Sequence, residues 1–451
     1  MELSVRGFKS IRSLDNFELR DVNILAGTNS SGKSSLTQAL LLLKQTIESD
    51  SKETLRLNGP YVFADNVVDL LYMKQKSNLL EYDIRLNRSE LIETERFDMY
   101  VPSGTFEYID IHLSFVANGN VHVQDFFVYL KDNQGNSVNL CIKRNKGNNN
   151  AAHDYYQVST SDGMLLGVSN AIGKKKSLDR CVLDFTNFFP IFGECMGKRT
   201  NVKLFSFPLI KLLRLALERV FADVFYIGPI RVKPALLKRY DVTPSMDRVD
   251  ADGDNTRYII QENRSLKVDG ERTLLEVLNE WVCDRLRLAN RIDTIKDANK
   301  FYRTQLQNDQ NLKVDLCHMG FGVSQVLPIL VQGLILPNNS IFIVEDPCVH
   351  MHPSIQAMMM DFLLDVANRG GRKVLVETHS DHIITRLRRR VAEGYDAQMV
   401  NLRFVSPSNE GSTYKKIDVT SQGAFAERLP EGFLDTQDDD FRAILRSRIR
   451  K

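Results

Sequence analysis

Apolar and polar positions follow two kinds of pattern along the chain, one at its two ends and another between them. Near the N-terminus, alternation from Leu3 is followed by an apolar run at 22–26, which predicts a buried strand. Residues 36–47 then carry apolar side chains at helical spacing, which predicts a helix packed by one face on a sheet. The first 47 residues therefore predict two strands, a buried strand, a loop and a helix.

The middle of the chain changes to a period of two. Residues 80–161 alternate in several runs that are separated by turn-forming Asn and Gly, which predicts an inserted antiparallel β subdomain. Residues 163–222 are predicted to be mostly helical, with an apolar stripe over 208–221. A short buried strand is expected at 224–227, and helical structure is expected from 274 to about 307.

The last third repeats the pattern of the N-terminal end. Two apolar strands, at 340–344 and 373–376, are each followed by polar residues and then by a helical pattern. Strands that alternate with helices predict a parallel sheet, and the polar residues at their carboxyl ends predict a site along that edge. We therefore expect an α/β fold of the P-loop NTPase type, with a mixed central sheet, an antiparallel β insertion and a helical subdomain. The expected parts are 1–79, 80–161, 162–314 and 315–451.

The loop between the first buried strand and its helix has the sequence GTNSSGKSS, which matches the phosphate-binding pattern G-x-x-x-x-G-K-[ST]. Lys33 is expected to contact the β- and γ-phosphates and the hydroxyl of Ser34 to bind Mg²⁺, while the helix N-terminus favours the anion. A Gly/Ser-rich turn that binds nothing is the alternative, and the flanking strand and helix disfavour it. The expected ATP-binding residues of this loop are Gly27, Thr28, Asn29, Ser30, Ser31, Gly32, Lys33, Ser34 and Ser35.

A P-loop needs a further acid at the end of a neighbouring strand to hold its metal. Glu345 and Asp346 directly follow the apolar strand at 340–344. We expect Glu345 to hold Mg²⁺ through a water molecule and Asp346 to polarise the attacking water. Helix caps or solvated charges are the alternative for such a pair, but the P-loop in the same chain favours the catalytic interpretation.

The amino-acid composition excludes some classes of protein, but it indicates no further functional site. The 451 residues have a formal net charge of +2, which argues against a chain that coats nucleic acid by charge alone. Six cysteines are scattered without a C-x-x-C pair, which favours reduced thiols over a disulfide scaffold or a zinc ribbon. Without a signal core or an apolar run near the ~18 residues of a membrane helix, a cytoplasmic protein is expected, with no membrane partner.

The acid pair also carries a family resemblance. The segment from Glu345 to Pro353, EDPCVHMHP, resembles the acid motif of the ABC-type ATPase heads of the structural-maintenance-of-chromosomes, RecF and overcoming-lysogenization-defect group. The resemblance covers about residues 1–50 and 315–400. Two residues depart from the family pattern: Asp346 stands where a longer Glu is frequent, which implies slower hydrolysis, and Cys348 stands where an acid is common.

Two further segments are assigned by this resemblance. Residues 320–325, GFGVSQ, look like the signature segment, so Gly322 and Ser324 are expected to contact the γ-phosphate held by an opposite protomer. Ser324 also fits a helix N-cap, and both roles are compatible. His379, in Glu-Thr-His-Ser after a buried strand, matches the switch histidine, which hydrogen-bonds the γ-phosphate. The resemblance thus implies a homodimer or a higher homo-oligomer that closes on ATP.

The material between the two ends indicates which relatives are nearest. It is β-rich and short-helical, without the sustained heptads of a long coiled-coil arm. The segments YIGPIR, GFGVSQVLPIL and ETHSDHIITRLRRR resemble stand-alone ATPases of bacterial antiphage defence operons, of the PARIS or Septu kind. That resemblance implies a switch that controls a partner effector, a nuclease or toxin encoded nearby.

Two other functions remain open from the sequence. One is a RecF-type repair ATPase that acts on DNA, for which the arginines at 386–390 could bind phosphates; a solvated charged face is the equal alternative. The other is a scaffold that holds ATP with little turnover, because Asp346 is a poor base. DNA-stimulated turnover, co-purification with a neighbouring gene product, or tight ATP retention would separate the three.

Overall fold

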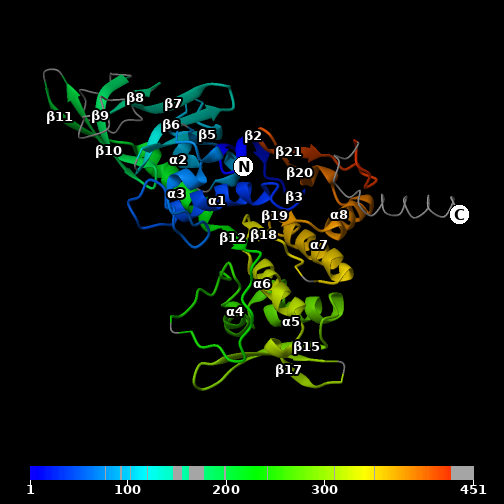
Figure 1. Cartoon of the computed structure of the whole chain (residues 1–451). Coiled ribbons are helices and arrows are strands. Elements are labelled where there is room, and N and C mark those ends of the chain that lie inside the picture. The colour runs from blue at the N-terminus through cyan, green and yellow to red at the C-terminus, as the bar shows by residue number, and fades with distance from the viewer. Residues whose placement is uncertain are drawn as a thin grey trace. The chain divides into compact units, whose positions relative to one another are not determined.

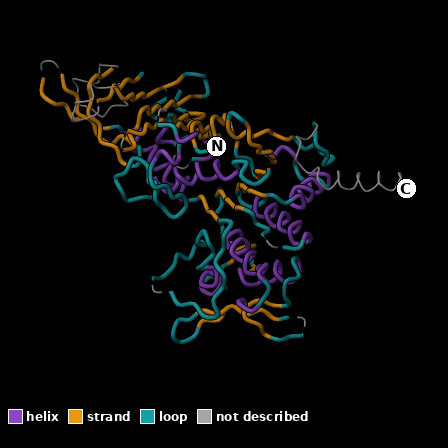
Figure 2. The backbone as a smooth tube through the Cα atoms, viewed as in Figure 1, coloured by secondary structure: helices purple, strands orange, loops and turns teal. Residues whose placement is uncertain are grey.

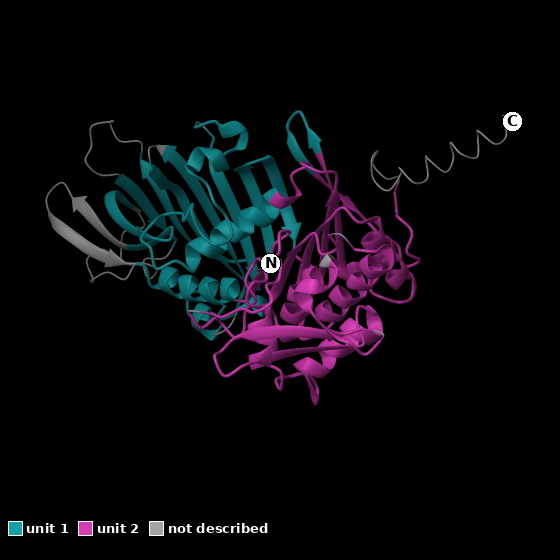
Figure 3. Cartoon of the chain, turned by 60° about the horizontal axis from the view of Figure 1, so that its bottom comes forward, with its two compact units in different colours: residues 1–18, 35–222, 407–413 teal, residues 19–34, 223–406, 414–451 magenta. Residues whose placement is uncertain are grey.

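The computed structural model describes residues 1–76, 78–91, 94–101, 103–118, 120–145, 155–161, 177–197, 200–240, 242–308, 310–349 and 351–427. The chain divides into two compact units, each assembled from separate parts of the sequence (Figure 3). Unit 1 comprises Met1–Glu18, Ser35–Ala222 and Pro407–Thr413, and unit 2 comprises Leu19–Ser34, Asp223–Ser406 and Tyr414–Lys451. The two units are described separately below.

Unit 1 is built on a ten-stranded sheet in the order β11-β10-β9-β8-β7-β6-β5-β4-β1-β2. Every neighbouring pair in it is antiparallel. The strands are β1 (Glu2–Phe8), β2 (Ile11–Glu18), β4 (Leu80–Asn87), β5 (Phe106–Asn118), β6 (Asn120–Asp132), β7 (Ser137–Asn145), β8 (Tyr155–Thr160), β9 (Ser177–Thr186), β10 (Phe189–Gly197) and β11 (Thr200–Ser206). The predicted antiparallel subdomain is therefore present, and it also includes the two N-terminal strands.

Two long helices pack within unit 1, α1 (Lys33–Ile47) and α3 (Pro208–Ala222). The hydroxyl of Tyr82 on β4 donates to the carbonyl of Ala39 in α1 at 3.3 Å, which joins the helix to the buried face of the sheet. Lys44 is fully buried and donates to the carbonyl of Phe221 at 2.6 Å, so it ties α1 to the end of α3. The short helices are η1 (Val67–Leu70), η2 (Tyr72–Lys74), η3 (Arg88–Glu90) and α2 (Glu95–Asp98).

Unit 2 is built on a six-stranded sheet in the order β12-β18-β19-β3-β20-β21 (Figure 1). Its strands are β3 (Val22–Gly27), β12 (Val224–Ile227), β18 (Ile341–Glu345), β19 (Lys373–Thr378), β20 (Val400–Ser408) and β21 (Gly411–Ile417). The pairings from β12 to β20 are parallel. Only two residues join β20 to β21, a connection that requires antiparallel neighbours. The sheet is therefore mixed, and the predicted α/β fold is confirmed.

Helices and two small sheets, β13-β14 and β15-β16-β17, complete unit 2 (Figure 2). One continuous apolar core joins one face of the β3 sheet, to which Val22, Ile24 and Ala26 belong, to these helices. The elements are α4 (Thr256–Glu262), β13 (Lys267–Asp269), β14 (Arg272–Thr273), α5 (Leu274–Asn279), the π-helical turn η5 (Glu280–Arg285), β15 (Arg291–Lys296), β16 (Tyr302–Gln307), β17 (Lys313–Asp315), η6 (Leu316–His318), α6 (Phe321–Ile335), α7 (Pro353–Ala367), α8 (Asp381–Ala392) and η7 (Ala397–Met399).

Two secondary-structure predictions are wrong. The stretch predicted as mostly helical before 208 forms β9, β10 and β11 where it is described, while residues 162–176 lie outside the described residues. The helix expected to reach 307 ends with η5, and β15 and β16 follow as a hairpin. In both stretches β-pairing with neighbouring strands outweighs weak local helix propensity.

The expectation of reduced thiols also needs correction. Cys181 is disulfide-bonded, whereas Cys141, Cys283, Cys317 and Cys348 are free. The expectation rested on linear spacing, and antiparallel pairing brings together residues that are distant in sequence. Among the described helices, none has the length and apolar character needed to cross a membrane.

Candidate nucleotide site

The parallel strands of unit 2 place the loops that follow their carboxyl ends at one edge of the sheet. The loop after β3 is the predicted P-loop, and its backbone has the conformations that this motif requires. Gly32 has φ of 101°, and a Cβ at Gly27 would lie 2.2 Å from the carbonyl oxygen of Val405. Both positions therefore favour glycine. The hydroxyl of Tyr414 donates to the carbonyl of Gly32 at 2.6 Å and fixes the end of the loop.

Lys33 is the first residue of α1, and its ammonium lies inside the loop. It donates to the carbonyls of Gly27 at 3.0 Å and Thr28 at 2.8 Å, and it lies 3.5 Å from Nδ1 of His379. Burial lowers the pKa of Lys33, while the charges of Glu377 and Asp346 oppose that shift. The ammonium is thus held at the mouth of the loop, where the motif places its phosphate contact.

The remaining loop residues differ in exposure. Thr28, Asn29 and Ser30 are exposed, whereas Ser31 and Ser35 are buried. Within unit 1, the hydroxyl of Ser35 lies 2.8 Å from the hydroxyl of Ser10. The exposed loop crown can therefore receive a ligand, and Ser35 has a structural contact of its own.

Glu377 is a further residue of the candidate site, which the sequence motifs did not identify. The hydroxyl of Ser34, the predicted metal ligand, donates to Oε2 of Glu377 at 2.7 Å. These residues are 343 positions apart, and they meet because β19 lies directly beside β3. The only sequence signal was a carboxylate in the Glu-Thr-His-Ser segment, two residues before the predicted switch histidine.

The acid pair lies one strand further from the P-loop than predicted. β18, which carries Glu345, is separated from β3 by β19, so it is not the neighbouring strand. Glu345 is buried, and its Oε1 accepts a 2.8 Å hydrogen bond from the hydroxyl of Tyr226. Burial raises the pKa of Glu345, the Tyr226 hydrogen bond lowers it, and the charge of Asp346 raises it.

Asp346 turns out of the sheet with a left-handed backbone, at φ of 42°. Its amide donates to the carbonyl of Glu377 at 2.9 Å, which links the loop after β18 to the end of β19. The P-loop lysine and both acids therefore converge on the same edge, and Glu377 stands between them.

His379 follows β19 and lies at the same edge. Burial lowers its pKa, the nearby Lys33 ammonium lowers it further, and Asp346 raises it. A neutral imidazole is thereby favoured next to the P-loop lysine. Ser380, the next residue, caps α8 by accepting from the amide of Ile383.

The predicted signature residues occupy the first turn of α6. The N-cap of this helix is Gly320, so the prediction that Ser324 serves as the N-cap is wrong. Ser324 is buried and lines a cavity of about 100 Å³ that Thr256 and Pro328 also line. Gly320 is exposed and Gly322 half-buried, so the backbone at the start of α6 is the accessible part of the segment.

The arginines of α8 are paired with groups of the same unit. Asp361 on α7 accepts from Arg386 at 3.1 Å and from Arg390 at 2.7 Å. Arg389 pairs with Glu393 at 2.7 Å, and Arg388 donates to the carbonyl of Gly423 at 2.7 Å. These contacts occupy the arginines that the sequence indicated as candidate phosphate-binding residues for DNA.

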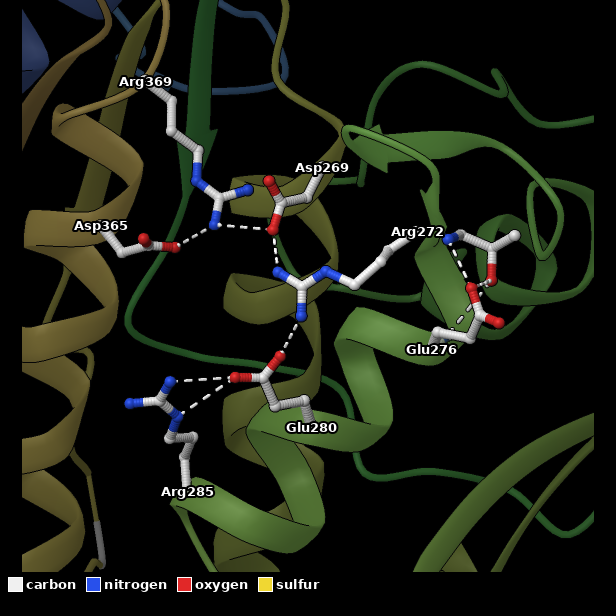
Figure 4. A network of polar contacts seen from close by, with 8 residues as sticks. Asp269, Arg272, Glu276, Glu280, Arg285, Asp365 and Arg369 are labelled. Atoms are coloured by element: carbon white, nitrogen blue, oxygen red, sulfur yellow. Dashed lines mark hydrogen bonds and ion pairs between the residues drawn. The ribbon is translucent and has the colours of Figure 1, made fainter.

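A second charge network joins the β13–β14 hairpin and η5 to α7. Arg369 pairs with Asp365 at 2.7 Å and with Asp269 at 3.6 Å, and it lies between them (Figure 4). Arg272 continues the network from Asp269 to Glu280 on η5. Each surface ion pair alone contributes little to stability. Together the pairs connect the β13–β14 hairpin and η5 to α7.

Comparisons with known proteins agree with a nucleotide-binding class. Residues 241–384 match the family described as AAA ATPase domain. No curated protein sequence is similar enough to match. Among solved structures, a structure titled the SmcHead bound to the C-winged helix domain of ScpA matches with 11% identity and a TM-score of 0.47, over 92% of this chain and 97% of the other.

Two further structures are similar at the same level. The SMC head domain from Thermotoga maritima has 10% identity and a TM-score of 0.38, over 93% of this chain and 98% of that one. The third is titled the Smc head domain with an extended coiled coil bound to the C-terminal domain of ScpA, derived from Pyrococcus furiosus. It has 11% identity and a TM-score of 0.44, over 100% of this chain and 99% of that one. The P-loop fold and the AAA ATPase domain match together support an ATPase.

Proposed function

We propose that this chain is an ABC-type ATPase that works as a nucleotide switch, binding ATP with Mg²⁺ at the edge of the β3 sheet and hydrolysing it there. The observation that carries the proposal is the convergence of Lys33, Ser34 and Glu377 with the acid pair at that edge. Lys33 would contact the phosphates, and the N-terminus of α1 would favour their charge.

The donor set also fits a magnesium ion. The hydroxyl of Ser34 and the carboxylates of Glu377 and Glu345 are oxygen ligands, the kind that Mg²⁺ prefers. Bound there, the metal would neutralise phosphate charge during transfer. Asp346 would orient and deprotonate the attacking water, and the neutral imidazole of His379 would hydrogen-bond the terminal phosphate.

In the switch, ATP is held between the P-loop of one protomer and the signature segment of another. The exposed start of α6 supports this role, because backbone N–H groups at a helix N-terminus bind anions and Gly322 permits close approach. We further propose that the output is control of a partner effector in antiphage defence, which rests on the resemblance of three segments to such ATPases. The paired arginines of α8 favour a protein partner over direct action on DNA.

The test is ATP binding and turnover by the purified full chain with Mg²⁺. Lys33→Ala should abolish ATP binding, whereas Glu345→Gln should bind ATP and hydrolyse it at least tenfold more slowly. Arg239→Ala, at an exposed position outside the site, is the control. Normal turnover by Lys33→Ala would refute the site, and strong stimulation by DNA would favour the repair function.

A further inference from the structure

The loop after β12 brings a buried arginine against the acid pair. Arg231 is 4% exposed, and its Nη2 donates to the carbonyl oxygens of Glu345 at 2.7 Å and Asp346 at 3.2 Å. Its segment, YIGPIR, carries only a family resemblance in the sequence, and no role for Arg231 follows from it. The contact links residues 114 and 115 positions apart across the end of β18.

The backbone that Arg231 contacts is strained. Asp346 has φ of 42°, a left-handed conformation that is unfavourable for an L-residue other than glycine. Such residues persist where surrounding contacts fix them, and they are frequent at active sites. Here the amide of Asp346 donates to the Glu377 carbonyl at 2.9 Å, while Arg231 binds the carbonyls on both sides of the strained residue's amide.

The position of Arg231 is itself fixed by its neighbours. The amide of Gly228 donates to the carbonyl of Ala251, and the amide of Val232 donates to the carbonyl of Asp252, each at 2.8 Å. The loop is thus anchored on both sides of Arg231. Burial lowers the pKa of its guanidinium to about 10, so the group stays charged at neutral pH.

Burying this group is costly, which argues that it does more than fill space. Among the described residues, Nε and Nη1 of Arg231 have no hydrogen-bond acceptor. An apolar side chain would avoid that penalty. The hydrogen bonds to the two backbone carbonyls offset this desolvation penalty. The benefit of burying Arg231 is therefore that it fixes the backbone geometry of the acid pair.

We propose that Arg231 is a positioning residue for ATP hydrolysis, holding the backbone of Glu345 and Asp346 in the left-handed turn that directs their carboxylates to the nucleotide. The inference rests on the proposed ATPase function. It predicts a defect in the chemical step and not in nucleotide affinity, because Arg231 contacts the acids and leaves the P-loop untouched.

The experiment measures Kd for a fluorescent ATP analogue and kcat for ATP in the full chain. Arg231→Met should leave Kd within about twofold and lower kcat roughly 10- to 100-fold, as expected for misplaced catalytic groups. Arg231→Lys should recover part of kcat, because an ammonium can still donate to both carbonyls. Arg239→Met, at an exposed arginine further along the chain after β12, should match the wild type in both quantities.

The outcomes separate the two hypotheses. Wild-type kcat in a folded Arg231→Met variant overturns the positioning role alone, and so does a loss of affinity at unchanged kcat, which would make Arg231 a ligand of the nucleotide. If Arg231→Met does not fold, Arg231→Lys decides: lower kcat at unchanged Kd supports the role, and wild-type kcat overturns it. Absence of ATP binding by the wild type overturns the proposed function, and this inference with it.

Discussion

At the scale of single residues, the contact between Ser34 and Glu377 changes how the metal site is understood. The sequence assigned the site to Ser34 and Glu345, but Glu377 is the carboxylate that directly accepts from the Ser34 hydroxyl. We expect Glu377→Gln to retain ATP binding through Lys33 and to lose roughly 10- to 100-fold in turnover, because a charged carboxylate of the proposed metal site is replaced by a neutral amide. Hydrolysis measured against Mg²⁺ concentration should show a weaker apparent metal affinity.

The matched control for that variant is Glu410→Gln. Glu410 is a highly exposed carboxylate that belongs to unit 1, so its neutralisation should leave the Mg²⁺ dependence unchanged. A Glu377→Gln variant with wild-type turnover at low Mg²⁺ would remove Glu377 from the proposed metal site.

Glu345 supplies a prediction about pH. Burial raises its pKa, so the folded chain holds this proton more tightly than the unfolded chain does. The corresponding stability is fully present below the unfolded pKa of about 4.3 and is lost as pH rises through the raised folded pKa. Glu345→Gln mimics the protonated side chain and can still accept from Tyr226. It should therefore unfold at a higher temperature than the wild type at pH 7.5, with a smaller difference at pH 5.

Glu393→Gln is the control, because the pKa of Glu393 is shifted in the opposite direction to that of Glu345. Hydrogen bonds from Arg389 and Arg390 lower the pKa of Glu393, so its charged form is the favoured one. Neutralising it should give no gain in unfolding temperature at pH 7.5. A Glu345→Gln variant that is less stable than the wild type at pH 7.5 would contradict the assigned cause of the Glu345 shift.

At the scale of elements, the packing of α7 on α8 depends on one acid. Asp361 is largely buried and binds both Arg386 and Arg390. Asp361→Ala should lower stability by about 1 kcal/mol or more, because two guanidinium groups lose their shared acceptor. Thermal unfolding monitored by circular dichroism would measure the loss. Asp418→Ala, which removes an exposed pair with Lys416, should change stability by no more than about 0.5 kcal/mol.

The elements that could be predicted from sequence are those whose burial pattern is strong. The apolar runs that became β3, β12, β18 and β19 are short and largely buried, and those of β18 and β19 end at polar residues. The strands β9, β10 and β11 were missed because their stability comes from cross-strand pairing, which local periodicity reports weakly.

The order of the strands could not be predicted at all. Periodicity shows that β3, β18 and β19 are parallel-type strands, but it does not show that β19 lies between the other two. That order decides which carboxylate reaches Ser34. It also explains why the P-loop and acid-pair motifs could be recognised in the sequence while the contacts of Glu377 and Arg231 were overlooked, because those contacts are set by the fold and not by spacing.

At the scale of the whole molecule, the proposed switch needs two chains for one active nucleotide. Gly322→Asp would place a carboxylate at the start of α6, facing the phosphates of the opposite protomer, while its own P-loop stays intact. Lys33→Ala has the reverse defect, with an intact signature segment and a defective P-loop. Each variant alone should hydrolyse ATP at least tenfold more slowly than the wild type, because every composite site in its homodimer lacks one half.

Mixing the two variants should restore part of the activity. In a mixed dimer, the P-loop of the Gly322→Asp chain faces the intact signature segment of the Lys33→Ala chain, so one of the two sites is complete. Random pairing at equal concentrations makes about half of the dimers mixed, which gives about a quarter of the wild-type sites. Turnover measured against mixing ratio should therefore peak near equal amounts. A mixture that remains as inactive as its components would contradict the shared site, whereas full turnover by Gly322→Asp alone would show that each chain hydrolyses ATP independently.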